Sequence, residues 1–183
     1  MRLILTLAIA LISLAAPCPA GAQLTPPEVL YQDPNWQLTT FHDRHDRTCL
    51  VAAREQPVAG PPTGIFMVYV ASMVSLKTQI MRIELMGPPR EYLASSRATS
   101  VAIDLGPAFR RQLRFQPLLG IFPTIVAELA AEDLDAIRAA LQPSGRELGI
   151  RFDNGVVWRY PPPRSSELAA KAAACWQKAG AIA

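Results

Sequence analysis

The chain begins with an apolar leader that restricts both where the protein matures and how much of it folds. Met1 and Arg2 are followed by the mostly apolar run Leu3 to Ala16, and Ala20-Gly21-Ala22 supplies the small residues of a cleavage site. This order is typical of a secretory signal peptide. We therefore expect residues 1–22 to be removed and the mature protein to begin at Gln23.

Only Cys49 and Cys175 remain after removal of the leader, and they lie near the two ends of the mature chain. Exported proteins mature in compartments where thiols oxidise and stay oxidised. We therefore expect a structural disulfide between them, with a redox pair or free thiols as the alternative. The third cysteine, Cys18, follows Pro17 instead of the small residue that a lipoprotein signal requires, so a lipid anchor at Cys18 is not expected.

The size and charge of the mature chain narrow its class. Removing 22 of 183 residues leaves 161, the size of one domain. The leader carries one of the 18 basic residues, so 17 basic residues remain against 15 acidic ones, a charge of +2. This charge is too small to predict binding to nucleic acid. The longest apolar stretch behind the leader, Gly64 to Ser72, is shorter than the ~20 residues of a transmembrane helix.

Alternation of apolar and polar residues predicts a chain made mainly of strands. In residues 79–86, Met81, Ile83 and Leu85 alternate with charged residues, which is the period of a half-buried strand. Asn154-Gly155 predicts a hairpin turn within residues 147–160. The other expected strands are residues 35–41, 48–53, 65–71, 100–105, 109–115 and 124–129, whereas the proline-rich residues 23–34 are expected to be an extended lead-in.

Two segments have helical spacing instead. Leu134, Ile137 and Leu141 share one face of a helix over residues 131–141. A last helix is expected over residues 166–178, with Cys175 on its apolar side. Together these patterns predict one disulfide-stapled domain over residues 35–183. Its expected fold is mainly β, an antiparallel β-sandwich or partly open barrel with one short internal helix and a C-terminal covering helix.

The run His42-Asp43-Arg44-His45-Asp46-Arg47 holds both histidines of the chain. Imidazole and carboxylate groups are suitable ligands for zinc or copper, which makes His42, Asp43, His45 and Asp46 candidate metal ligands. Strand alternation would scatter these side chains, however, and the two arginines would repel a cation. A solvated, charged hairpin turn is therefore the favoured interpretation, and no metal or cofactor is assigned.

No catalytic residues are assigned from the sequence. The G-x-S-x-G motif of serine hydrolases is absent, and a serine triad would have to take its base from the same charged turn. Cys49 and Cys175 do not form a C-x-x-C pair. Any two of the fifteen acidic residues can meet in space, but solvated surface charge is the simpler interpretation. We therefore expect a protein that is not an enzyme.

Aromatic and basic residues offer candidates for a binding surface. The aromatic candidates are Trp36, Trp158, Tyr160 and Trp176. The basic candidates, which would supply an anion-attracting face, are Arg110, Arg111, Arg114, Arg151 and Arg159. The favoured interpretation is that the tryptophans pack in the core and that the arginines lie on the solvated side of the strands.

The succession of Trp36, a polar turn, Cys49 and the late Cys175 resembles the small exported proteins of the invasion-associated locus B type. The similarity is architectural and extends over residues 35–178. The chain differs in having Pro34-Asn35 before Trp36 and no second cysteine pair. This resemblance implies a non-catalytic periplasmic or envelope protein, without catalytic residues to assign.

These observations lead to three functional hypotheses. The first is a non-enzymatic periplasmic protein that binds an envelope protein partner or stabilises an assembly. The second is a periplasmic carrier of a small ligand or lipid that uses the interior of the β-structure. The third, which has the least support, is a metal-dependent hydrolase centred on His42 and His45.

Overall fold

The computed structural model describes residues 26–43, 46–54, 64–94, 98–118 and 122–180. The strands within these ranges are β1 (Glu28–Gln32), β2 (Trp36–Asp43), β3 (Asp46–Arg54), β4 (Ile65–Met73), β5 (Thr78–Met86), β6 (Thr99–Asp104), β7 (Arg110–Leu118), β8 (Thr124–Glu128), β9 (Leu148–Phe152) and β10 (Val157–Tyr160). The helices are α1 (Arg90–Ala94), α2 (Ala131–Ala140) and α3 (Glu167–Lys178), with a short 3-10 turn η1 (Val74–Leu76).

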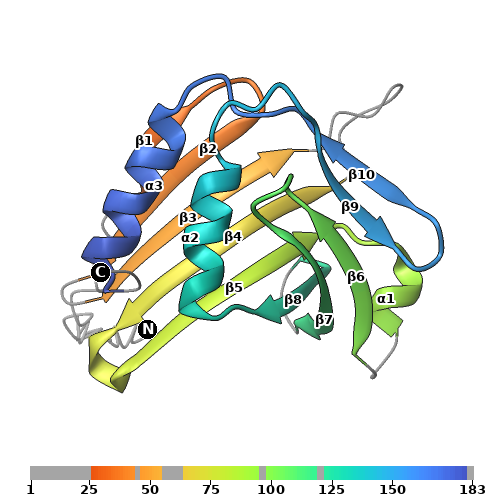
Figure 1. Ribbon diagram of the computed structural model, residues 1–183. Coiled ribbons are helices and arrows are strands. Elements are labelled where there is room, and N and C mark those ends of the chain that lie inside the picture. The colour runs from red at the N-terminus through yellow and green to blue at the C-terminus, as the bar shows by residue number, and fades with distance from the viewer. Residues whose placement is uncertain (1–25, 44–45, 55–63, 95–97, 119–121, 181–183) are drawn as a thin grey trace, which may run out of the picture.

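All ten strands belong to one antiparallel sheet that does not close into a barrel. Its order is β1-β2-β3-β4-β5-β8-β7-β6-β9-β10. The first five strands are neighbours in sequence order, and β8 then pairs with both β5 and β7. Figure 1 shows the sheet curving around α2 and α3, which lie on its inner face. The expected fold class, mainly β with a covering C-terminal helix, is confirmed.

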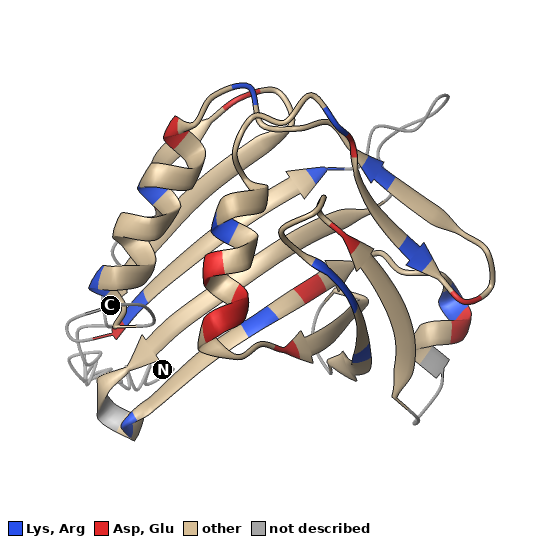
Figure 2. Ribbon diagram, viewed as in Figure 1, with Lys and Arg blue, Asp and Glu red and all other residues tan. Residues whose placement is uncertain are grey.

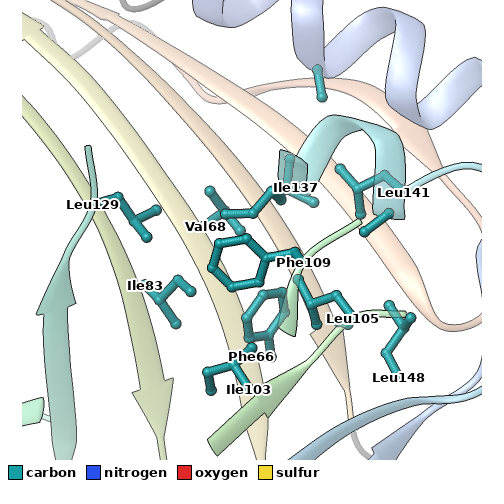
Figure 3. Packing of buried hydrophobic residues seen from close by; sticks show 14 of the residues in the cluster. Phe66, Val68, Ile83, Ile103, Leu105, Phe109, Leu129, Ile137, Leu141 and Leu148 are labelled. Carbon is teal, nitrogen blue, oxygen red and sulfur yellow. The ribbon is translucent and has the colours of Figure 1, made fainter. Parts of the chain in front are cut away.

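The core lies between the inner face of the sheet and these two helices. Phe66 and Val68 of β4 point inward and are fully buried. Figure 3 shows them beside Phe109 and beside Ile137 of α2. The helical spacing of Leu134 and Ile137 therefore has the expected role, because both side chains are completely buried against the sheet.

A disulfide ties α3 to the sheet. Cys49 of β3 and Cys175 of α3 are bonded, with their Cα atoms 6.0 Å apart, as expected from the sequence. Leu168, Ala172 and Trp176 lie on the same side of α3 and are fully buried. The last helix is thus held on the opening strands both by apolar packing and by a covalent bond.

The far edge of the sheet curves back toward its beginning. Trp158 of β10 lies over Gly64, where an added Cβ atom would be only 2.6 Å from the indole ring. The ring of Tyr160 lies 5.9 Å from that of Phe66, and the Trp36 Nε1 donates a hydrogen bond to the Pro161 carbonyl oxygen at 2.7 Å. The aromatic residues therefore belong to the core, as the favoured interpretation held, and they do not line an open groove.

The structure differs from the sequence predictions at three places. Residues 28–32 of the expected lead-in form β1, which pairs with β2 and buries Tyr31. The expected charged turn at 42–47 is shorter, since Asp43 still belongs to β2 and Asp46 to β3. Helix α1 was not predicted, because its five residues are too few to show a helical period.

Arg111 breaks the apolar alternation of β7 for a physical reason. It lies on the same side of the strand as Leu113 and Phe115, and its guanidinium group forms an ion pair with the Asp133 carboxylate of α2, with nitrogen and oxygen 3.0 Å apart. The guanidinium group also lies 5.8 Å from the centre of the Phe109 ring. An inward-facing arginine is thus tolerated because α2 supplies a partner at the boundary of the core.

In the part of the chain that the structure describes, no helix is long and apolar enough to span a bilayer.

Candidate functional site

The predicted basic surface forms a hollow on the outer face of the last strands. This hollow has a volume of about 470 Å³. It is separate from a cavity of about 500 Å³ at the other end of the molecule. We call the space on the last strands the arginine hollow. Its outward-facing arginines are Arg110, Arg151 and Arg159, around a floor of Ala102 and Gly149, whereas Arg111 borders the space with its guanidinium group directed to Asp133 on the inner side. Figure 2 shows the basic residues on β7, β9 and β10.

Strand register explains how residues distant in sequence meet here. Arg159 of β10 lies opposite Gly149, which pairs with Asp104, which in turn pairs with Arg110 of β7. Neighbouring strands are about 4.8 Å apart, so the two arginine backbones are separated by about 14 Å. This row of paired residues therefore places Arg159 and Arg110 on opposite sides of a space above Gly149 and Asp104, where no large side chain stands.

The neighbouring row provides the central cation. Arg151 of β9 pairs with Ala102 of β6 and with Val157 of β10. Because a Cβ atom added to Gly149 would meet nothing within 4 Å, the floor beside Arg151 is open. Small floor residues thus give a ligand access to the side of the arginines, and not only to their tips.

Two of the arginines are held by exposed carboxylates. Arg110 Nε lies 3.0 Å from the Asp104 carboxylate, and Arg159 lies 3.4 Å from the Glu147 carboxylate. All four side chains are roughly half exposed or more. Exposed ion pairs of this kind contribute only about 0–1 kcal/mol, so a partner's carboxylate can replace the internal one at low cost. Arg151 has no ion pair among the described residues.

Asp104 stays ionised and orients Arg110. Burial by itself would raise the pKa of Asp104, but hydrogen bonds outweigh that effect and hold the pKa below its usual value. The donors are the backbone N–H of Gly106, at 3.0 Å, and the Arg110 guanidinium group. The lining thus combines the three guanidinium groups of Arg110, Arg151 and Arg159 with the carboxylates of Asp104 and Glu147, which leaves an excess of positive charge.

The sequence candidates are therefore largely brought together. Arg110, Arg151 and Arg159 face the hollow, and Arg111 borders it but directs its guanidinium group to Asp133 on the inner side. Arg114 lies outside it, exposed on β7 and paired with Ser100, two residues beyond the row of Ala102. Sequence reasoning missed the floor, because the roles of Ala102 and Gly149 depend on the pairing of β6 with β9.

The structure does not gather the candidate metal ligands that it describes. His42 faces inward beneath α3, in register with Arg47. The Asp46 carboxylate instead accepts a hydrogen bond from the Val74 backbone N–H at 2.9 Å. His45 and the side chain of Asp43 lie outside the described residues. Among the residues that are described, no group of three or more histidine, cysteine or acidic side chains is placed to hold a metal ion.

Comparison of the chain with protein-family models, with curated proteins and with solved structures found no significant match.

Proposed function

We propose that the protein is an exported, non-catalytic binding protein that holds an acidic segment of an envelope protein in the arginine hollow. The observation that carries this proposal is the placement of three outward-facing arginines, Arg110, Arg151 and Arg159, around an open floor of small residues. Arginine is enriched in protein interfaces, and its planar group binds carboxylates with two parallel hydrogen bonds.

The spacing of the arginines favours an extended acidic segment as the partner. The two outer arginines stand about 14 Å apart across four strands, with Arg151 between them. In an extended chain, side chains on one face recur about every 6.7 Å, twice the rise per residue of a strand. Two or three alternating carboxylates can therefore reach the outer and central arginines together.

Export is part of the same proposal, and its support comes from two separated features. The leader has the order of a signal peptide, and the paired cysteines suit an oxidising compartment.

The inner face of the sheet is occupied by packed side chains such as Phe66, Ile103 and Phe109. A partner that binds the outer face leaves this core undisturbed.

A peptide titration tests the proposal. The probe is an eight-residue peptide of alternating Glu and Ser, compared with its Gln–Ser counterpart by isothermal titration calorimetry at low salt. We expect the acidic peptide alone to bind, and Arg151→Gln to weaken it about two- to fivefold, since an exposed ion pair contributes up to about 1 kcal/mol. Binding should weaken in 1 M salt, where charges are screened within about 3 Å.

Arg138 of α2 provides the matched control. It is about half exposed and paired with Asp135, but it lies on a helix away from the hollow. Arg138→Gln removes the same charge and should leave affinity unchanged. Equal losses in the two variants would show that net charge, not the hollow, attracts the peptide. Equal binding of the Gln–Ser peptide would also contradict the proposal.

A further inference from the structure

A second cavity lies at the open end of the inner face, between α3 and strands β1 to β3. It has a volume of about 500 Å³. We call it the end cavity. Thr40, His42 and Arg47 form its floor, while Ala174, Cys175 and Lys178 of α3 form one wall. The opposite wall comes from Glu28, Val29 and Leu30 of β1.

The end cavity begins where the apolar core stops. Cys49 and Cys175 are buried, and the next inward-facing residue of β3 toward the end of the sheet is Arg47, which is only partly buried. Leu30 and Cys175 therefore give the inner part of the cavity an apolar lining, Ala174 is exposed on its wall, and its outer part carries charge. A space of this kind fits a molecule with one apolar end and one charged end.

The charge at the outer part is mainly positive. Arg47 and Lys178 have no ion pair among the described residues, and the His42 ring lies 3.4 Å from the Thr40 hydroxyl oxygen. Lys171 is already occupied, because its ammonium group donates to the Leu30 carbonyl oxygen and pairs with Glu167, both at 2.7 Å. Glu28 is the one acidic residue of the lining, and it is exposed.

We propose that the end cavity binds an amphipathic carboxylate, with its carboxylate group at Arg47 and Lys178 and its hydrocarbon chain against Leu30, Ala174 and Cys175. The size is adequate. Octanoate has about ten non-hydrogen atoms, which at roughly 30 Å³ for each water-sized group occupy about 300 Å³. This is less than the volume of the end cavity. The site is separate from the arginine hollow.

Titration with octanoate, followed by calorimetry on the oxidised protein, tests this proposal. Octanoate should bind at least tenfold more tightly than acetate, which lacks the chain, and than octanol, which lacks the charge. Arg47→Gln should weaken octanoate binding at least tenfold. Arg54→Gln is the matched control, since Arg54 is an exposed arginine at the opposite end of the same strand and should have no effect.

A second variant keeps the test independent of folding. Lys178 is exposed in the last turn of α3, and Lys178→Gln should weaken octanoate binding while circular dichroism remains that of the wild type. Failure of octanoate to bind at 10-fold excess over a millimolar protein sample, equal binding of octanol, or unchanged affinity in both variants would overturn the proposal. Binding to anionic lipid vesicles without binding to octanoate would overturn it as well.

Discussion

Breaking the Cys49–Cys175 bond is expected to destabilise the protein strongly. The bond closes a loop of 126 positions and links α3 to β3. For a loop of this length, the chain-entropy relation gives about 5 kcal/mol at 25 °C. This is an upper value, because residual structure in the unfolded chain reduces it. A domain of this size has a total stability of about 5–15 kcal/mol, so the loss is a large fraction of the whole.

The effect can be measured by thermal unfolding of the oxidised and the reduced wild-type protein. A change of 1 kcal/mol shifts the midpoint by about 2–4 °C in a chain of this length, so about 5 kcal/mol predicts a decrease of about 10–20 °C on reduction. The double variant Cys49→Ala/Cys175→Ala should unfold at a similarly low temperature and should not respond to reductant. A decrease below about 3 °C on reduction would refute the reasoning, because it would mean that apolar packing alone holds α3.

Two further predictions concern single positions, and a third concerns the mass of the exported chain. Gly64→Ala should cost about 1–3 kcal/mol in urea unfolding, because its Cβ atom would meet the Trp158 ring, whereas Gly149→Ala should be nearly neutral, since its Cβ atom meets nothing within 4 Å. Burial alone would raise the pKa of Asp33, but hydrogen bonds from two backbone N–H groups lower it below 3.8 in the folded protein. The ionised Asp33 therefore stabilises the folded state above pH 3.8, and this contribution is lost as the pH falls through the pKa of the folded state. Asp33→Asn should therefore reduce stability by about 1 kcal/mol at pH 7, and its deficit should shrink in urea titrations at low pH; an equal deficit at pH 7 and pH 2 would contradict this. Intact mass of the exported protein should correspond to a chain that begins at Gln23 and contains one disulfide, and a retained leader would contradict the export proposal.

Local patterns in the sequence were sufficient to predict most of the elements. The alternation in residues 79–86 corresponds to β5, and the helical spacing of Leu134 and Ile137 corresponds to α2. These predictions succeeded because the side-chain period reports which face is buried. β1 was missed because prolines flank its five residues and leave little alternation to detect.

The arginine hollow was only half predictable. The sequence predicted that the arginines lie on the solvated side of the strands, which holds for Arg110, but it did not indicate that Arg111 reaches Asp133 on α2. The floor needs Gly149 beside Asp104, a pairing between strands more than forty residues apart. Such contacts depend on strand order, and a sequence pattern that reports only local periods does not contain it.

Mapping the acidic peptide by nuclear magnetic resonance tests the central claim most directly. In a two-dimensional amide spectrum of the oxidised protein, the Glu–Ser peptide should shift the amide signals of Ala102, Gly149 and Arg151 most strongly, while those of Ala174 and Lys178 at the end cavity stay in place. The claim would be contradicted if the three hollow signals remained fixed at a peptide concentration that saturates binding, or if the largest shifts appeared on α3.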